Sequence, residues 1–321
     1  MKLLSSTLLL LSLSFSAVAD ESKSAKAWLE RLSSSLKSLN FSTSFVVIKN
    51  NQAQPYHWFH GTDETDGTQL EIISSLNGPR RDILRIGDIV SYIQPESPPY
   101  SVTSKQISGP IPAILSGDIA QLESGYDFIS VGRSRILGRP AQLIRIEAKK
   151  AYRYAYWLWL DQKSGMLLKL SIVTKKGQQL EQIQFTHLEV SQKLSETLLQ
   201  LQSTELPVIV DIPQEYQQQK LQWQVSWLPE GFKQINSNRH KISLTKQPVE
   251  FMLFSDGLVD ISIYVNGTKD QQRDADFVMD GATVVLNQVN KGIEVSVVGK
   301  IPSQTAKAIA DSITIMPPKA P

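Results

Sequence analysis

Two groups of arginines are the residues whose type and spacing most suggest chemistry. They are Arg80, Arg81 and Arg85 in one predicted strand region and Arg133, Arg135 and Arg139 near another. Guanidinium groups bind phosphates or carboxylates through paired hydrogen bonds, so two groups that converged at one end of a sheet would form an anion site. The alternative is a charged outer face, which is how charge runs usually behave. The candidate anion-binding residues are Arg80, Arg81, Arg133 and Arg135.

The sequence gives no indication of metal or enzymatic chemistry. Of the four histidines, only His57 and His60 are close in sequence, and an i, i+3 pair in a strand points to opposite faces. The chain has no cysteine and lacks the H-E-x-x-H, G-x-S-x-G, phosphate-loop and G-x-G-x-x-G motifs. We therefore predict no metal site, no cofactor and no enzymatic activity.

The first nineteen residues predict a secretory signal peptide. Lys2 supplies a positive start, residues 3–15 are apolar, and Ala17-Val18-Ala19 offers a cleavage site. The apolar run is shorter than the roughly 20 residues that span a bilayer. We predict that the chain is a soluble periplasmic protein once residues 1–19 are removed.

Composition narrows the range of partners. The 321 residues are 41% apolar and 20% charged, which is long enough and apolar enough for two domains. Without cysteine, an exported chain can form no disulfide and cannot carry a lipid on an N-terminal cysteine. Removal of Lys2 lowers the formal net charge from +2 to about +1, so we expect no global attraction to nucleic acid or anionic membranes.

The densest aromatic stretch of the chain carries three strand-like runs, at residues 126–133, 141–148 and 152–160. In the last run, a period of two places Tyr154 and Tyr156 on one face, and Arg153 and Trp157 on the other. Both faces then have apolar contacts to make, which suits a strongly curved sheet. The run can be a core strand or the wall of a cavity, and the pattern leaves both open.

A mainly β domain is predicted for residues 20–204. Apolar residues recur at helical spacing over residues 24–40, which predicts an amphipathic helix. About ten or eleven short strands follow, and their close spacing favours antiparallel pairing. The proline-rich residues 94–122 predict a loop with short helices that lies over the sheet. Together these elements predict a large curved antiparallel sheet or an incomplete antiparallel β-barrel, with the short helices as a lid.

A smaller α+β domain is predicted for residues 221–318. Residues 205–220 contain two prolines and a polar run, which are typical of an interdomain linker. Beyond them, strand-like runs flank the turn Asp256-Gly257, which predicts a hairpin, and another pair is predicted between residues 283 and 298. A final helix is predicted to begin with Ser303 as its N-cap.

Five segments spread along the mature chain carry a resemblance to a known family. They are Asn77-Gly78-Pro79-Arg80-Arg81, Tyr126-Asp127-Phe128-Ile129-Ser130-Val131-Gly132-Arg133, Trp227-Leu228-Pro229-Glu230-Gly231-Phe232, Phe254-Ser255-Asp256-Gly257-Leu258 and Gln304-Thr305-Ala306-Lys307. These segments resemble the MucB/RseB family of periplasmic sigma-E regulators. The resemblance implies an N-terminal domain similar to the lipoprotein carriers LolA and LolB. It also implies a protein that binds the periplasmic region of the anti-sigma factor RseA, shields it from the protease DegS, and is released by lipopolysaccharide or mislocalised lipoprotein.

With this resemblance in view, two groups of candidate binding residues are assigned. The candidate partner-binding residues are Trp227, Leu228, Phe232, Asp256 and Leu258, for which packing within turns is the alternative role. The candidate lipid-binding residues are Phe45, Trp58, Tyr154, Tyr156 and Trp157, with Ile111, Ile114 and Leu115 as the lid.

The alternative function is that of a lipid or lipoprotein carrier of the LolA type. Burial of an acyl chain of about a dozen carbons offers on the order of 10 kcal/mol, at roughly 0.8 kcal/mol per methylene. Reversal of a two-state equilibrium from 1:99 to 99:1 requires only about 5.5 kcal/mol, so one chain could release a regulator from its partner. The second domain favours the regulator, because a simple carrier would not need it. The sequence leaves open whether the protein forms a homo-oligomer.

Overall fold

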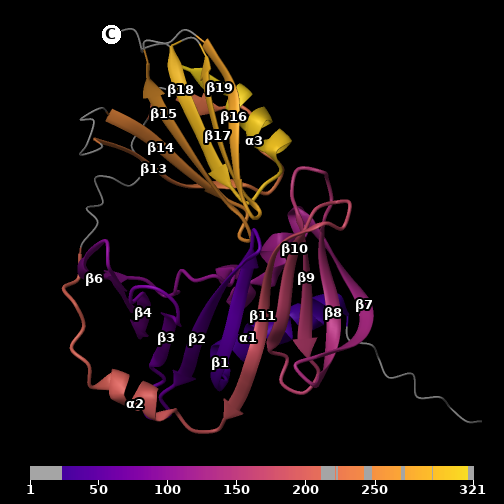
Figure 1. Ribbon diagram of the computed structural model, residues 1–321, viewed down its shortest axis with the longest axis vertical. Coiled ribbons are helices and arrows are strands. Elements are labelled where there is room, and N and C mark those ends of the chain that lie inside the picture. The colour runs from indigo at the N-terminus through magenta and orange to yellow at the C-terminus, as the bar shows by residue number, and fades with distance from the viewer. Residues whose placement is uncertain are drawn as a thin grey trace, which may run out of the picture.

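The computed structural model describes residues 24–210, 221, 223–241, 248–268, 272–290 and 292–316. The predicted signal peptide and residues 211–220 of the predicted linker lie outside the described residues. Figure 1 shows a strongly curved sheet in indigo to magenta and a smaller sheet with a helix in orange to yellow. The predicted fold class, an incomplete antiparallel β-barrel followed by a smaller α+β domain, is confirmed.

The first helix, α1 (Ala25–Ser38), lies where the helical periodicity predicted it. Ser24 caps the helix, because its side-chain oxygen accepts the N–H of Ala27 at 3.1 Å. The buried leucines of α1 are spaced so that they share one side of the helix, and they are Leu29, Leu32 and Leu36. This side packs against the sheet and next to two short 3₁₀-helices, η1 (Ala113–Ser116) and η2 (Ile119–Ser124).

The first domain contains one antiparallel sheet of eleven strands, in the order β6-β5-β4-β3-β2-β1-β11-β10-β9-β8-β7. The strands are β1 (Asn40–Lys49), β2 (Gln52–Thr62), β3 (Gln69–Ser75), β4 (Asp82–Ile86), β5 (Ile89–Gln94), β6 (Ser97–Thr103), β7 (Tyr126–Ile136), β8 (Arg139–Ala148), β9 (Ala155–Asp161), β10 (Leu167–Val173) and β11 (Gln179–Ser191). Asn50 and Asn51 both have positive φ between β1 and β2, which is the geometry of a type I′ hairpin turn. Pairing of β1 with β11 joins the two halves of the sheet, whereas β6 and β7 form its two edges.

The structure corrects two of the predicted elements in this domain. Strand β6 contains Pro98 and Pro99, in a region predicted as a loop. Because β6 is an edge strand, its prolines can be accommodated without breaking a ladder on both sides. Strand β9 begins at Ala155 and not at Tyr152, so Arg153 precedes the strand and is buried.

A short helix, α2 (Glu196–Gln202), is followed by a segment that covers the edge strand β6. The Ser101 N–H donates to the Val208 carbonyl at 2.9 Å, and the Val210 N–H donates to the Ser101 carbonyl at 2.8 Å. The first residues of the predicted linker therefore extend the sheet. The predicted domain boundaries at residues 204 and 221 stay predictions.

The second domain contains a six-stranded sheet in the order β13-β14-β15-β18-β17-β16, and a two-stranded pair of β12 and β19. Its elements are β12 (Trp223–Val225), β13 (Lys233–Lys241), β14 (Pro248–Ser255), β15 (Asp260–Gly267), β16 (Gln272–Asp280), β17 (Thr283–Asn290), β18 (Ile293–Gly299), α3 (Ser303–Asp311) and β19 (Ile313–Ile315). The predicted hairpin around Asp256-Gly257 and the pair between residues 283 and 298 are confirmed. The predicted cap is wrong: Pro302 precedes the helix, Ser303 is its first residue, and no side chain caps the end.

None of the described helices combines the length and the apolar character needed to cross a membrane.

Candidate functional site between the two domains

One face of the eleven-stranded sheet packs against α1, and we call it the inner face. The register places Thr43 opposite Trp58 on this face, and Phe45 opposite both Tyr56 and Phe185. The Phe45 ring stacks on Tyr56 at 5.3 Å and on Phe185 at 5.6 Å. Aromatic pairs of this kind add about 0.5–1.5 kcal/mol beyond the burial of their area. Phe45 is thus a core residue, and its contact with lipid stays a prediction.

The two central aromatic residues of β9 lie on opposite faces of the sheet. Tyr156 is opposite Ile172 on the inner face, whereas Trp157 is opposite Ser171 on the outer face. The guanidinium of Arg145 lies 4.3 Å from the centre of the Trp157 ring. The structure therefore does not bring Trp157 together with Tyr156, because successive strand residues alternate between faces.

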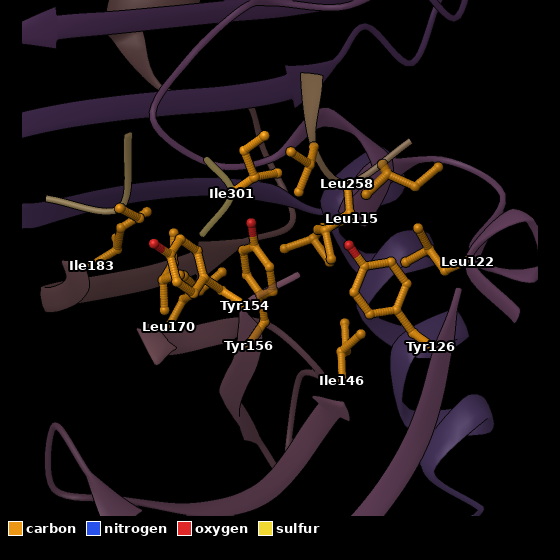
Figure 2. Close-up of a cluster of buried hydrophobic side chains, with 14 of the residues drawn as sticks. Leu115, Leu122, Tyr126, Ile146, Tyr154, Tyr156, Leu170, Ile183, Leu258 and Ile301 are labelled. Atoms are coloured by element: carbon orange, nitrogen blue, oxygen red, sulfur yellow. The ribbon is translucent and has the colours of Figure 1, made fainter. Parts of the chain in front are cut away.

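A cavity of about 690 Å³ lies between the inner face and the second domain, and we call it the interdomain cavity. Its walls come from the inner face, from the lid segment 106–118, and from the C-terminal domain through residues 255–260 and 298–300. Figure 2 shows the Tyr156 side chain pointing from the first domain toward Ile301 of the second, whereas the Tyr154 ring points toward Ile183. The volume falls in the range of about 300–1,000 Å³ that is typical of ligand sites.

The predicted lipid-binding residues are divided among several places. Tyr156, Ile111 and Ile114 line the interdomain cavity. Leu115 is fully buried in the core, and Tyr154 is buried in the same cluster without lining the cavity. Their contacts with lipid stay predictions.

The interdomain cavity also has polar groups in its walls. The Tyr156 hydroxyl is buried and has no hydrogen-bond partner within the described part of the chain, and burial raises the pKa of Tyr156 well above its ordinary value. Glu181 accepts a hydrogen bond from Lys300 at 2.6 Å and another from the Ala282 N–H at 3.0 Å. A buried polar group without a partner costs about 1–3 kcal/mol, so a ligand that satisfied Tyr156 would recover that energy. The cavity can therefore take an amphiphile as well as a pure hydrocarbon.

A second cavity, of about 320 Å³, lies beside the first and shares part of the lid with it. The Arg85 Nη1 atom lies 2.7 Å from Glu71 Oε1, and the Trp58 indole donates to Glu71 Oε2 at 3.2 Å. The buried His60 lies 2.8 Å from the Leu39 carbonyl through Nδ1, and burial lowers the pKa of His60. Trp58 is thus a predicted lipid residue that lines a cavity with charged walls.

The predicted anion site is not assembled. Arg81 lies next to β4 and Arg133 lies on the edge strand β7, with seven strands between β4 and β7 in the sheet order. Arg80 pairs with Asp82 at 2.5 Å, Arg81 pairs with Glu96, and Arg135 donates to the Gly138 carbonyl at 3.2 Å. These contacts fit the alternative of charged surface residues. Among the residues that the structure describes, no group of three or more His, Asp or Glu side chains could hold a metal ion.

Glycine-containing turns bring the second domain against the first. Gly231 has φ +92°, and a Cβ placed there would lie 2.7 Å from the Ser124 hydroxyl oxygen. Gly281 has φ +62°, and a Cβ there would lie 2.7 Å from the side chain of Glu181. Both positions require glycine for two reasons, the left-handed backbone and the closeness of the facing domain. The turns are therefore shaped for this contact.

The predicted partner-binding residues lie at the contact between the domains. The Trp227 ring packs edge-on against Tyr152 with 5.1 Å between ring centres, and the Phe232 ring lies 4.8 Å from the Arg153 guanidinium. The remaining predicted residues are partly or fully buried in the same region, and they are Leu228, Asp256 and Leu258. Their contact with a partner stays a prediction. In the present arrangement they pack within the molecule.

The contact between the domains contains a buried ion pair that the sequence interpretation missed. Arg153 Nε donates to Asp256 Oδ2 at 2.7 Å, and the two side chains are 2% and 3% exposed. The Tyr126 hydroxyl donates to the same oxygen at 3.0 Å, and Arg153 also donates to the Glu230 carbonyl. Burial raises the pKa of Tyr126, so its hydroxyl keeps its proton. The only signal for Arg153 in the sequence was a single charge inside an aromatic run, which alternation placed on the same face as Trp157.

Comparison with known proteins places both domains in one family. Residues 24–208 match the MucB/RseB N-terminal domain, and residues 217–314 match the MucB/RseB C-terminal domain. The sigma-E factor regulatory protein RseB of Salmonella typhimurium is 33% identical over 303 residues, which cover 94% of each chain. The sigma factor AlgU regulatory protein MucB of Pseudomonas aeruginosa is 29% identical over 312 residues, which cover 96% of each chain.

Solved structures agree with this assignment. The complex of Pseudomonas aeruginosa MucA and MucB matches with a TM-score of 0.74 and 28% identity, covering 92% of this chain and 99% of that chain. A structure of MucB with the periplasmic part of MucA gives a TM-score of 0.73, covering 92% and 100%. A structure of MucB alone gives 0.58 at the same identity, covering 91% and 98%. On the evidence of both domains, the chain belongs to the MucB/RseB family.

Proposed function

We propose that the protein is a negative regulator of an envelope stress response of the sigma-E type. It binds the periplasmic region of an RseA-type or MucA-type anti-sigma factor and shields that region from the protease DegS. The observation that carries the proposal is the match of both domains to MucB bound to MucA, over 92% of this chain and 99% of that chain. The function lies in binding, and we assign no catalytic residue.

A lipid signal releases the protein from its partner in this proposal. The interdomain cavity supports it, because isoleucines and Leu170 of the first domain, with Leu258, Val259 and Val298 of the second, line a space of about 690 Å³ next to the domain contact. The ligand is an acyl chain of lipopolysaccharide or of a mislocalised lipoprotein. The predicted signal peptide places these events in the periplasm.

Protection of the anti-sigma factor tests the main proposal. The periplasmic segment of RseA is incubated with active DegS, with and without the purified mature protein. We expect cleavage to slow in proportion to the fraction of the segment that is bound. Cleavage that proceeds unchanged at saturating protein would overturn the proposal. An unrelated DegS substrate serves as the control, because direct inhibition of the protease would slow both reactions.

A lipid or lipoprotein carrier is the second candidate, and the cavity beside the inner face is the observation that favours it. A carrier should transfer lipid without the second domain, whereas a regulator should not need to transfer lipid at all. A variant that ends at Thr204 and the full mature chain are therefore compared in transfer of a radiolabelled lipoprotein between vesicles. Full transfer by the short variant would favour the carrier over the regulator.

A further inference from the structure

The loop of residues 255–259 in the second domain belongs both to the buried ion pair and to the wall of the interdomain cavity. On one side, Asp256 pairs with Arg153 of the first domain and accepts the Tyr126 hydroxyl. On the other side, Gly257, Leu258 and Val259 form part of the wall of the interdomain cavity. The same short loop therefore contacts both the ion pair and any ligand in the cavity.

A single carboxylate connects the two sides of this loop. Asp256 Oδ2 accepts from Arg153 and Tyr126, while Asp256 Oδ1 accepts from the backbone N–H groups of Leu258 and Val259 at 3.0 and 2.8 Å. A displacement of Leu258 or Val259 would therefore pull on the carboxylate that the first domain holds. Hydrogen bonds to a charged acceptor are strong and directional, so the pair and the loop should move together.

The ion pair also holds a particular arrangement of the two domains. It is enclosed by aromatic rings, since Arg153 lies 5.3 Å from the centre of the Tyr126 ring and 4.8 Å from that of Phe232. The overall structure is more similar to MucB with MucA, at TM-scores of 0.74 and 0.73, than to MucB alone, at 0.58. The identity is 28% in all three comparisons. The fold of the whole chain, in which Arg153 and Asp256 join the two domains, is thus nearer to that of the partner-bound relatives.

We propose that the Arg153–Asp256 pair is a latch that holds the domains in the arrangement that binds the anti-sigma segment, and that an acyl chain in the interdomain cavity opens it through the loop 255–259. This inference rests on the proposed function and adds its regulation. The latched form binds the partner, and the lipid-loaded form has the latch released. A protein whose competent form is one-tenth populated binds with a tenfold weaker apparent affinity.

The distance between the domains tests the latch directly. The chain has no native cysteine, so cysteines introduced at the exposed positions Glu189 and Asp274 can carry the only two spin labels. Pulsed electron paramagnetic resonance then gives the distribution of distances between the two domains. We expect a narrow distribution for the labelled wild type and a broad, longer one for the D256N variant. Asparagine keeps an oxygen for the loop N–H groups but removes the charge that Arg153 requires.

The matched control is D161N. Asp161 is 1% exposed and pairs at 3.0 Å with Arg139, whose side chain is 31% exposed, so D161N removes a buried carboxylate charge from an ion pair within the first domain alone. D161N should leave the distance distribution unchanged. Tyr126→Phe keeps the latch charges and removes one hydrogen bond, so it should broaden the distribution less than D256N. Circular dichroism shows whether each variant is folded. If D256N does not fold, the distance distribution of Tyr126→Phe decides whether the latch holds the domains together.

Binding separates failure of the latch from failure of the proposed function. The affinity for the RseA periplasmic segment should fall at least about tenfold in D256N and stay unchanged in D161N. If the wild type does not bind the segment, the proposed function fails, while the distances still decide whether the latch exists. If D256N opens the domains yet binds as tightly as the wild type, the latch has no regulatory role and the proposed function stands.

Palmitate serves as the acyl probe for the cavity. Its binding is followed by displacement of a fluorescent fatty acid, and the distance distribution is measured in the same samples. We expect palmitate to broaden the distribution of the wild type toward that of D256N. Palmitate that binds without any change in the distances would overturn the coupling between the cavity and the latch, and so would the absence of palmitate binding.

Discussion

The contact between the domains contains an ion pair at each of two ends, and one pair is buried whereas the other is exposed to solvent. At the buried end, Arg153 and Asp256 are 2% and 3% exposed. At the exposed end, Lys49 and Asn50 both bind Asp280, and the Lys49 and Asp280 side chains are 42% and 53% exposed. An exposed pair is screened by water and salt, whereas removal of one partner of a buried pair leaves an uncompensated charge. We therefore expect the buried end to matter more than the exposed end for the stability of the contact between the domains.

The largest expected effect comes from breaking the buried end. Arg153→Met should lower the free energy of unfolding by about 3–5 kcal/mol, because Asp256 would keep its burial and lose its cation. Urea unfolding followed by both tryptophan fluorescence and circular dichroism measures the change, since a chain of two domains need not unfold in one step. A loss below about 1 kcal/mol would mean that the buried ion pair contributes no more to the free energy of unfolding than an exposed pair does.

A smaller effect should follow when the ion pair is kept and one hydrogen bond to it is removed. Tyr126→Phe deletes the hydroxyl that lies 3.0 Å from Asp256 and should cost about 1.5–3 kcal/mol, the usual contribution of a hydrogen bond to a charged group. The same unfolding measurement applies. Tyr156→Phe is the matched control, because the Tyr156 hydroxyl has no hydrogen-bond partner among the described residues, so its removal should not lower the free energy of unfolding.

Mild acid should destabilise the first domain through His60. Burial lowers the pKa of His60, so the folded state binds fewer protons than the unfolded state, whose histidines titrate near pH 6.5. This stability is fully present above about pH 6.5 and is lost as the pH falls below it, with a slope of at most about 1.4 kcal/mol per pH unit for one site.

Unfolding curves between pH 5 and pH 7 check this expectation for the wild type and for His60→Gln. The variant should show a shallower dependence on pH. Burial also lowers the pKa of His57, so His57→Gln is measured beside it. An unchanged slope in His60→Gln would show that His60 does not carry the effect.

The smallest effect is expected at the exposed end. Lys49→Ala should lower the free energy of unfolding by about 0.2–1 kcal/mol at low salt, and by less at high salt, because exposed pairs are weak and screened. Unfolding at two salt concentrations measures this dependence. A loss as large as that of Arg153→Met would mean that the exposed ion pair stabilises the domain contact as much as the buried ion pair does.

Local sequence patterns were enough to predict the parts of the fold that depend on neighbouring residues. The helix at residues 25–38 followed from leucine spacing, and the turn at Asp256-Gly257 followed from residues that favour positive φ or hydrogen bond within a turn. The prolines of β6 were misleading because a proline is acceptable in an edge strand, and sequence does not reveal which strands are edges. Strands β13 and β16 were missed for a related reason. Both lie at the edges of the second sheet, and β16 is exposed along most of its length.

The candidate site was only partly predictable. Tyr156 and Ile114 were assigned to a lipid cavity and line one, whereas Trp157 was placed with them although alternation had put it on the other face. Arg153 was missed because its partner, Asp256, is 103 residues away along the chain. A charge within an aromatic run has no evident role until the segment that neutralises it is brought beside it.

By itself, the sequence determined the antiparallel β architecture, the smaller second domain and the family resemblance, because each depends on residues near one another or on motifs in order. Only the tertiary structure decided that the turns at Gly231 and Gly257 contact the first domain. It also decided that residues of these turns surround a cavity and a buried ion pair. The physical reason is that burial and pairing of charges are properties of surfaces in contact. Segments distant along the chain form such surfaces only when the domains dock.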